Sequence, residues 1–452
     1  MLDISIIGRS YDLRGIYPTE IDEEFYYLFG RSFGTWVRGK SIALWYDARN
    51  SSPSLQHAFG QWIMDSGKKL ISLWLCSSDM TSFSTGYYND IDAAVMITAS
   101  HNPKDYNGMK ASLKWWIPVN LKEIWPILID WIHQYNTSPI PPIQWEYEER
   151  QILDDWVNHI LSFSHTKNFG KISLIADAWN GTAWVFMDAL TKKAGWNLTP
   201  LFFDPDGNFP NHHPNPVLEE NRKDCRKKIQ ETKSDIWLIF DGDADRVVIL
   251  DENGDNISPS IICAIIAHKI LVENPWAGIC GNAVTSKIVQ DITLENGGKY
   301  TRQKVWHVYI KEEMSKDSSI LFAWEWSAHY FFQKNWNADS GIIAAIIFLD
   351  ILSQSWKKTS ELIEVYTRYK TLEETNFKVA NPKWLIEKLA ENFSELKQDR
   401  LDGLTVYYPY GWWNVRPSSN EPLLRLNLET ETKEQFDILY EKLVNFIESN
   451  SL

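Results

Sequence analysis

Cysteine and long apolar runs are both scarce in this chain of 452 residues. The four cysteines lie far apart and make no metal-ligand spacing, which argues against a disulfide framework and fits a reducing cytoplasm. No apolar stretch approaches the roughly 18 residues of a membrane span, and the N-terminus lacks the basic and apolar segments of a signal peptide. The sequence therefore predicts a cytoplasmic globular protein that does not bind a membrane.

Basic residues are also outnumbered, because 45 Lys and Arg face 59 Asp and Glu, which gives a net charge of −14. An acidic balance argues against sequence-independent binding of nucleic acid. It still allows a local basic pocket for a phosphorylated metabolite. The length is enough for about three domains and for a large core that needs no disulfide.

Glycine is rarer than tryptophan, with 22 residues against 23, although glycine usually makes up about 7% of a protein. Many tryptophans stand where a turn or close packing favours glycine. They are Trp45, Trp62, Trp74, Trp179, Trp184, Trp237, Trp306, Trp324 and Trp356. The chain is either a tryptophan-rich protein with compensating packing or the product of a gene in which UGA specifies glycine. We favour the second interpretation, under which some tryptophans, such as Trp413, are still genuine.

Three stretches share one pattern, in which an apolar strand is followed by a small or polar turn and then a helix. They are SIALWYDARNSS near residue 41, KISLIADAWNGTAW near 171 and SDIWLIFDGDADR near 234. Strands that alternate with helices predict α/β units with mostly parallel sheets. The segment 404–430 instead alternates, is rich in aromatics and turns at Tyr410–Gly411, and helical spacing follows it. The C-terminal part therefore reads as a separate α+β domain.

Ser100 follows an apolar run, IDAAVMI, that reads as a buried strand, and turn-forming residues come after it in TASHNPKDYNG. Loops at strand ends often carry function. Ser100 is thus a candidate nucleophile that could carry a phosphoryl group, although a plain turn serine fits the local sequence equally well.

Three carboxylates, Asp241, Asp243 and Asp245, alternate directly after the apolar strand IWLIF, and Arg246 follows them. In a tight loop they can converge on one hard cation, which prefers oxygen ligands. A solvated acidic turn is the alternative, and the segment does not match an EF-hand because no Glu follows at the required spacing. A cation and a serine together suggest phosphoryl transfer.

Other polar segments are weak signals when each is taken alone. RPSSNEP begins at Arg416, whose guanidinium could bind a phosphate through two parallel hydrogen bonds. An ordinary capped turn could have the same sequence. In WEWSAHY, Glu325 and Ser327 suit hydrogen bonds to sugar hydroxyls, unless the segment is only a strand end with a core histidine at His329. The remaining polar candidates are Tyr11, Arg14 and His307.

Taken together and in this order, the segments from YDLRG to RPSSNEPLLRLN resemble the α-D-phosphohexomutase family, most closely its phosphomannomutase/phosphoglucomutase branch. TASHNP and DGDADR are specific motifs when they occur at this separation. The resemblance implies three similar α/β domains with mixed, mostly parallel sheets and a C-terminal α+β domain of the TATA-binding-protein type, all around a central cleft. These domains would span 1–150, 151–256, 257–368 and 369–452.

The resemblance also implies a role for each candidate residue. Ser100 would carry the phosphoryl group and would bind Mg²⁺ together with Asp241, Asp243 and Asp245. The other catalytic residues would be Arg14, Lys110, Arg246 and His329, with Lys110 and Arg14 assisting proton transfer. The substrate-binding residues would be Tyr11, His307, Glu325, Ser327, Arg416, Ser418, Ser419 and Asn420. The clamp sequence RPSSNEP departs from the family form R-P-S-N-T-E-P at two positions, and both replacements keep hydrogen-bonding groups.

The implied reaction moves a phosphoryl group reversibly between C1 and C6 of mannose or glucose phosphates, with hexose 1,6-bisphosphate as intermediate and activator. The expected partner is the hexose phosphate alone, without nucleic acid or membrane, and the expected state is a monomer or weak dimer. Three alternatives stay open: a phosphoglucosamine mutase, a metal-dependent serine phosphatase and an inactive phosphosugar-binding homologue.

Overall fold

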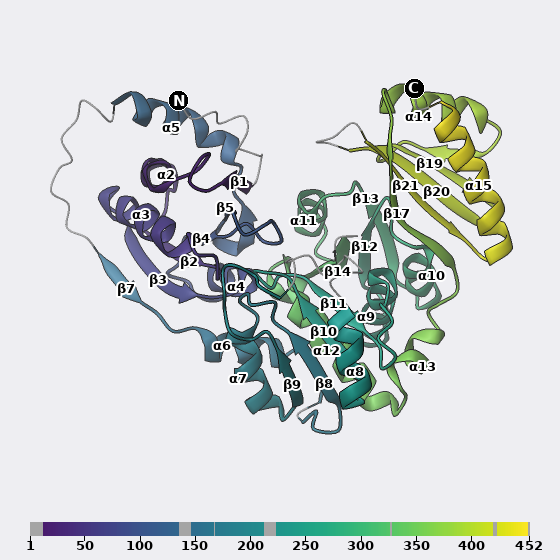
Figure 1. Ribbon diagram of the computed structural model, residues 1–452, viewed down its shortest axis with the longest axis horizontal. Coiled ribbons are helices and arrows are strands. Elements are labelled where there is room, and N and C mark those ends of the chain that lie inside the picture. The colour runs from purple at the N-terminus through teal and green to yellow at the C-terminus, as the bar shows by residue number, and fades with distance from the viewer. Residues whose placement is uncertain are drawn as a thin grey trace. The chain divides into compact units, whose positions relative to one another are not determined.

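The computed structural model describes residues 12–134, 146–166, 168–211, 223–325, 328–418 and 423–450. They belong to two compact units, one formed by Met1–Ile257 with Lys334–Thr359 and the other by Ser258–Gln333 with Ser360–Leu452. Figure 1 traces both units along the chain by colour. Each unit is built around two sheets with their own packed helices.

The first sheet of unit 1 has the strand order β1-β5-β4-β2-β3-β7, with β6 paired to β5. Its strands are β1 (Asp12–Ile16), β2 (Ser41–Tyr46), β3 (Lys69–Leu75), β4 (Ala93–Ile97), β5 (Tyr106–Leu113), β6 (Ile117–Pro118) and β7 (Tyr147–Glu149). Strand β2 is parallel to β3 and β4, whereas β5 is antiparallel to β1 and β4. The helices here are α2 (Glu23–Trp36), α3 (Ser52–Asp65), α4 (Ser78–Tyr87) and α5 (Trp125–Gln134), with 3-10 turns at Lys114–Trp116 and Leu121–Glu123.

The second sheet of unit 1 has the order β11-β10-β8-β9. Its strands are β8 (Ser173–Asp177), β9 (Asn197–Leu201), β10 (Ile236–Phe240) and β11 (Val247–Leu250). Strand β8 is parallel to β9 and β10, and β11 returns antiparallel to β10. The remaining elements of this region are α6 (Leu153–Leu161), α7 (Trp184–Ala194), α8 (Lys223–Thr232), β16 (Ala338–Asp339) and α12 (Gly341–Ser355).

Unit 2 contains a mixed sheet and an antiparallel sheet. In the mixed sheet, β12 (Gly278–Asn282) is parallel to β13 (Lys299–Gln303) and β14 (Ile320–Glu325), and β15 (His329–Phe332) is antiparallel to β14. The antiparallel sheet has the order β17-β21-β20-β19-β18, with strands β17 (Lys370–Lys378), β18 (Lys397–Asp399), β19 (Leu404–Tyr408), β20 (Gly411–Pro417) and β21 (Leu423–Thr430). The helices are α9 (Pro259–Glu273), α10 (Lys287–Glu295), α11 (His307–Lys316), α14 (Pro382–Asn392) and α15 (Lys433–Ser449); η4 (Gln333–Asn335) and α13 (Thr359–Glu364) are short links.

The predicted fold class is confirmed. The α/β sheets are mixed and mostly parallel, and the C-terminal sheet is antiparallel with α14 and α15 packed into one apolar core with it. The turn predicted at Tyr410–Gly411 joins β19 to β20, where Tyr408 pairs with Gly411. A capping box between Thr432 and Gln435 fixes the start of α15. The four domain boundaries stay a prediction.

Several tryptophans adopt backbone conformations that suit glycine. Among the described non-glycine residues, fifteen have a positive φ, and seven of these are Trp74, Trp115, Trp116, Trp179, Trp306, Trp336 and Trp356. Four of the seven stand at positions where the sequence alone favours glycine. A positive φ is a genuine outlier for a bulky residue, since its Cβ meets the neighbouring backbone. The backbone at these positions therefore has the geometry expected of a glycine site.

Two further tryptophans are buried in strands that lead to loops. Trp45 of β2 and Trp237 of β10 are fully buried, and the indole N–H of each has no hydrogen-bond acceptor among the described residues. Leaving a buried donor unpaired costs about 1–3 kcal/mol. Such donors are rare in native cores.

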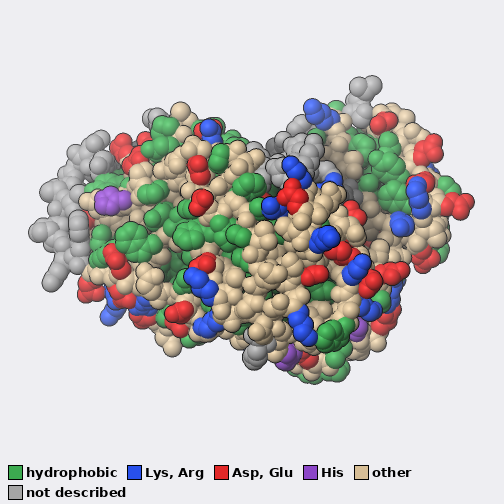
Figure 2. Space-filling view, turned by 60° about the horizontal axis from the view of Figure 1, so that its bottom comes forward, with side chains coloured by type: hydrophobic (Ala, Val, Ile, Leu, Met, Phe, Trp, Pro, Cys, Tyr) green, Lys and Arg blue, Asp and Glu red, His purple; other side chains and the backbone are tan. Residues whose placement is uncertain are grey.

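On the face shown in Figure 2, acidic and basic side chains are interspersed, and neither sign of charge dominates. Among the described helices, none is both long and apolar enough to cross a membrane.

Candidate active site

Ser100 lies in the loop after β4 and is almost completely buried, with 3% of its surface exposed. Its φ is +50°, a left-handed conformation that a non-glycine residue adopts only where its surroundings hold it. Arg49 holds this loop, because its buried guanidinium donates to the carbonyl oxygens of Ser100 at 2.8 Å and Asn102 at 2.7 Å. Arg49 is not among the residues predicted from the sequence, although its place shortly after β2, in YDARN, is a signal that could have revealed it.

The acidic loop after β10 faces the Ser100 hydroxyl. Ser100 Oγ donates to Asp241 Oδ2 at 3.0 Å, and Arg246 Nη2 donates to Ser100 Oγ at 3.0 Å. Arg246 also pairs with Asp241, at 2.6 Å. Two segments 141 residues apart in the sequence thus meet around one hydroxyl group.

The three aspartates are close enough together to share one divalent cation. One carboxylate oxygen from each of Asp241, Asp243 and Asp245 lies within 4.8 Å of the others, and all three residues are buried. Asp243 Oδ1 and Asp245 Oδ1 are buried and accept no hydrogen bond from the described residues. Buried carboxylate oxygens without a donor are costly unless something positive faces them. The residues present therefore fit a hard cation such as Mg²⁺.

Two basic side chains from the neighbouring antiparallel strands border the acidic loop. Lys110 of β5 forms ion pairs with Asp243, at 2.7 Å, and with Asp245. Arg14 of β1 donates to Asn102 Oδ1 at 3.5 Å and pairs with Asp12 at 3.1 Å. Since Arg14 is aligned with Gly108 and Asp12 with Lys110, the β1–β5 register brings both cations to this edge of the sheet.

Burial and charge shift the pKa values of these groups in opposite directions. Burial is the largest influence on Asp241 and raises its pKa to about 6, against the opposing effect of Arg246. Burial also disfavours the charged form of Asp243, but Lys110 outweighs it and lowers the pKa of that carboxyl. Burial alone would lower the pKa of Lys110, yet Asp243 and Asp245 raise it, so Lys110 is a cation here. The Arg246 charge, followed by burial, holds the pKa of His101 well below its usual range.

The candidates in unit 2 lie at the ends of β14 and β20. Glu325, the last residue of β14, pairs across the strands with His329, and His329 Nδ1 lies 3.4 Å from Glu325 Oε2. His307 is the first residue of α11 and directly follows Trp306, whose φ is +151°. Glu325 is 8% exposed, so its carboxylate lies largely within the fold.

Arg416 comes near the end of β20 and is buried with 7% of its surface exposed. It donates to Glu374, which also pairs with Arg425 at 3.2 Å. Burial lowers the pKa of Arg416, while Glu374 opposes that effect. The Ser418 backbone N–H donates to Leu423 O at 2.8 Å, closing the base of the hairpin between β20 and β21. The predicted residues Tyr11, Ser327, Ser419 and Asn420 lie outside the described part of the chain.

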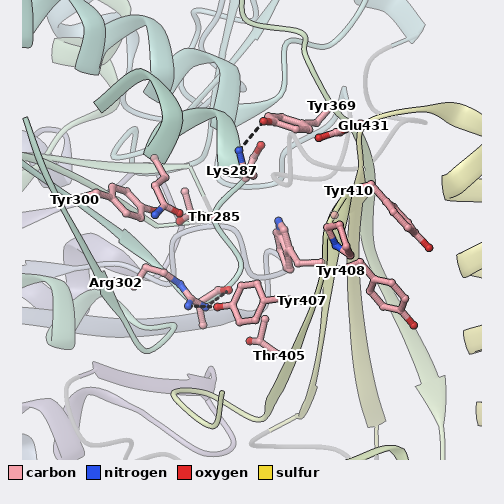
Figure 3. Close-up of a pocket in the computed structure, with 16 residues that line it drawn as sticks. Thr285, Lys287, Tyr300, Arg302, Tyr369, Thr405, Tyr407, Tyr408, Tyr410 and Glu431 are labelled. Atoms are coloured by element: carbon pink, nitrogen blue, oxygen red, sulfur yellow. Dashed lines mark hydrogen bonds between the residues drawn. The ribbon is translucent and has the colours of Figure 1, made fainter. Parts of the chain in front are cut away.

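A separate pocket of about 130 Å³ lies in unit 2 and contains none of the candidate residues (Figure 3). Its walls include five tyrosines: Tyr300, Tyr369, Tyr407, Tyr408 and Tyr410. Its two cations already have partners, because Lys287 Nζ donates to Tyr369 at 2.9 Å and to Asp291, and Arg302 pairs with Asp399 at 2.7 Å. Both cations that line this pocket are therefore held in ion pairs within unit 2.

A buried serine that faces three clustered carboxylates and an arginine has the functional groups that metal-assisted phosphoryl transfer uses. Comparisons with known proteins show the family. Four consecutive parts of the chain match the phosphoglucomutase/phosphomannomutase domains: alpha/beta/alpha domain I at 6–122, domain II at 154–254, domain III at 258–369 and the C-terminal domain at 374–445. The chain belongs to the phosphoglucomutase/phosphomannomutase family, whose members are isomerases that act on hexose phosphates.

Individual relatives match over nearly their whole length. A phosphomannomutase of Methanocaldococcus jannaschii is 32% identical and covers 98% of this chain and 97% of its own. A phosphomannomutase of Escherichia coli is 30% identical, over 93% of this chain and 94% of its own. The crystal structure of a phosphoglucomutase/phosphomannomutase family protein from Burkholderia thailandensis has a TM-score of 0.87 at 27% identity and covers all of this chain and 98% of its own.

Proposed function

We propose that this protein moves a phosphoryl group reversibly between C1 and C6 of mannose and glucose phosphates, through a phosphorylated Ser100 and a hexose 1,6-bisphosphate. The observation that carries the proposal is the position of the Ser100 hydroxyl, which contacts both Asp241 and Arg246. A phosphoryl group on this oxygen would meet a guanidinium and a cation-binding carboxylate set at once. Such charge neutralisation and positioning supply most of the catalysis in phosphoryl transfer.

The proposed transfer conserves atoms and charge at each step. The bond between Ser100 Oγ and phosphorus breaks as a bond forms between phosphorus and one sugar hydroxyl oxygen, whose proton is released while Ser100 Oγ regains a proton. The bisphosphate then presents its other phosphate, and the reverse transfer restores phosphoserine and releases the isomer. Arg246 would stabilise the phosphoryl oxygens, and Lys110 with Arg14 would assist the proton transfers from the edge of the loop.

Asp241, Asp243 and Asp245 would hold Mg²⁺ together with the phosphate on Ser100. When bound, Mg²⁺ would offset the negative charge that the phosphoryl oxygens carry. Asp243 Oδ1, which accepts no hydrogen bond from the described residues, supports this assignment, and Asp245 Oδ1 has only the Arg246 guanidinium 3.7 Å away among the recorded ion pairs.

The residues of unit 2 would recognise the substrate. Glu325 and Ser327 would bind sugar hydroxyls, with His329 as a catalytic neighbour held by Glu325. The other proposed substrate-binding residues are Tyr11, His307, Arg416, Ser418, Ser419 and Asn420, with Arg416 leading the phosphate clamp. We further expect hexose 1,6-bisphosphate to act as activator, and we expect a cytoplasmic monomer or weak dimer with no nucleic-acid or membrane partner.

The sugar preference can be tested in side-by-side assays of mannose 1-phosphate, glucose 1-phosphate and glucosamine 1-phosphate. We expect comparable kcat/KM values for mannose 1-phosphate and glucose 1-phosphate, because Glu325 would form hydrogen bonds with hydroxyls that the two sugars share. Catalytic amounts of hexose 1,6-bisphosphate should raise the rate, and inorganic phosphate should not accumulate. A strong preference for the glucosamine ester, or steady release of phosphate, would contradict the proposed activity.

A further inference from the structure

Asp243, the middle carboxylate of the acidic loop, is held from one side only. Its Oδ2 atom accepts hydrogen bonds from Ser78 Oγ at 2.6 Å, Lys110 Nζ at 2.7 Å and Thr98 Oγ1 at 3.3 Å. Its Oδ1 atom is buried and accepts none from the described residues. Three donors therefore fix the orientation of the carboxylate, and the free oxygen is the one left to face a cation.

Ser78 holds the same residue through its backbone as well. Its N–H donates to the Asp243 carbonyl oxygen at 2.9 Å, so Ser78 binds Asp243 through both its side chain and its main chain. Ser78 is the first residue of α4, and the preceding Ser77 caps that helix by accepting a hydrogen bond from Met80 N at 3.4 Å. Because Ser77 serves as the cap, the Ser78 hydroxyl is free to reach the acidic loop, 165 residues away in the sequence.

The start of a second helix holds the backbone of the next aspartate of the loop. Gly341, the first residue of α12, donates its N–H to the Asp245 carbonyl oxygen at 3.0 Å. A Cβ at Gly341 would lie 2.8 Å from the carbonyl carbon of Arg246, so only glycine permits this approach. Ser340, which caps α12, donates to Asp79 Oδ2 at 2.6 Å. Since Asp79 follows Ser78 in α4, the two helix starts are tied to each other as well as to the loop.

We propose that Ser78 is a positioning residue that orients Asp243 Oδ2 through its hydroxyl and so presents Oδ1 to the divalent cation. The inference rests on the proposed cation site, which it deepens. Ser78 touches neither substrate nor the reacting atoms and acts through Asp243. The contribution of such outer hydrogen bonds to metal affinity is typically about 10–100-fold.

The test is a titration of dephosphorylated protein with Mn²⁺, in which electron paramagnetic resonance measures the free ion. We expect Ser78→Ala to raise the Kd for Mn²⁺ about 10–100-fold. Ser78→Thr keeps the hydroxyl and is expected to bind as the unmodified chain does. Ser84→Ala is the matched control, because Ser84 is a buried serine of the same helix whose hydroxyl donates to Thr81 O at 2.8 Å.

The outcomes separate this inference from the cation site itself. If the unmodified chain binds Mn²⁺ and Ser78→Ala binds it equally well, the positioning role is wrong while the site stands. If the chain is folded by circular dichroism and still binds no Mn²⁺, both are wrong. Equal losses in Ser78→Ala and Ser84→Ala would also contradict the proposal, because they would reflect the packing of α4. Should Ser78→Ala not fold, Ser78→Cys, which keeps the size with a weaker donor, carries the same expectation.

Discussion

Replacing the exposed Trp74, Trp306 and Trp356 together by glycine is expected to raise the free energy of unfolding by roughly 3–6 kcal/mol, at about 1–2 kcal/mol per left-handed residue. All three have positive φ values, between +57° and +151°, and their exposed rings leave little packing to lose. A whole domain is stable by only about 5–15 kcal/mol, so the expected gain is comparable to the entire margin. The measurement is chemical denaturation followed by circular dichroism, with activity assayed in parallel.

Trp356 gives the cleanest single comparison. It ends α12 in a left-handed conformation with φ +57°, the place where glycine most often ends a helix, and it is 80% exposed. Little packing is lost when its ring is removed, apart from the Lys171 ammonium 4.2 Å from the ring centre. Trp356→Gly should therefore stabilise the chain by about 1 kcal/mol.

Trp413 provides the control with the opposite sign. It is fully buried in β20, and its ring lies 5.2 Å from that of Phe393 in the C-terminal core. Trp413→Gly should destabilise the chain by about 3–5 kcal/mol. If the three-site glycine variant is no more stable than the chain as printed, the glycine interpretation fails.

The codons test the origin of these tryptophans directly. UGA at Trp45, Trp179, Trp306 and Trp324 would mean that the gene specifies glycine there and that the printed chain folds poorly. UGG at those positions would contradict this and would leave a tryptophan-rich protein with unusual backbone conformations. The functional variants are best compared in both backgrounds, since a poorly folded chain would hide their effects.

Ser100→Ala is expected to lower kcat for hexose phosphate isomerisation by about a thousandfold or more, because it removes the oxygen that would carry the phosphoryl group. The neighbouring cations and carboxylates stay in place, so the variant should still bind hexose phosphate. Ser112→Ala is the control, because Ser112 is a buried serine of β5 whose hydroxyl makes no hydrogen bond with described residues. Full activity in Ser100→Ala, or an equal loss in Ser112→Ala, would count against the assignment.

The local parts of the site could be predicted from the sequence because each follows one simple pattern. Apolar runs that end in polar residues gave the strand ends before Ser100 and Asp241, and the alternation in 404–430 gave the C-terminal hairpin. The glycine-like positions also follow from turn patterns, and four of the nine tryptophans named from the sequence have positive φ values.

The long-range parts could not be predicted, because they depend on register and on contacts between distant segments. Arg14 reaches the loop edge only through the antiparallel pairing of β1 with β5. Ser78 reads as a helix-start serine, and nothing local distinguishes it from the cap at Ser77. Arg416 reads as a free phosphate ligand, whereas the fold pairs it with Glu374 on a neighbouring part of the same unit.

The phosphorylation state of Ser100 tests the central claim most directly. Freshly purified protein, and protein incubated with hexose 1,6-bisphosphate, can be compared by intact and peptide mass spectrometry. The account predicts partial phosphorylation that maps to the peptide containing Ser100, rises with the bisphosphate and is lost on incubation with excess hexose monophosphate. An active protein in which Ser100 never carries phosphate under any of these conditions would contradict it.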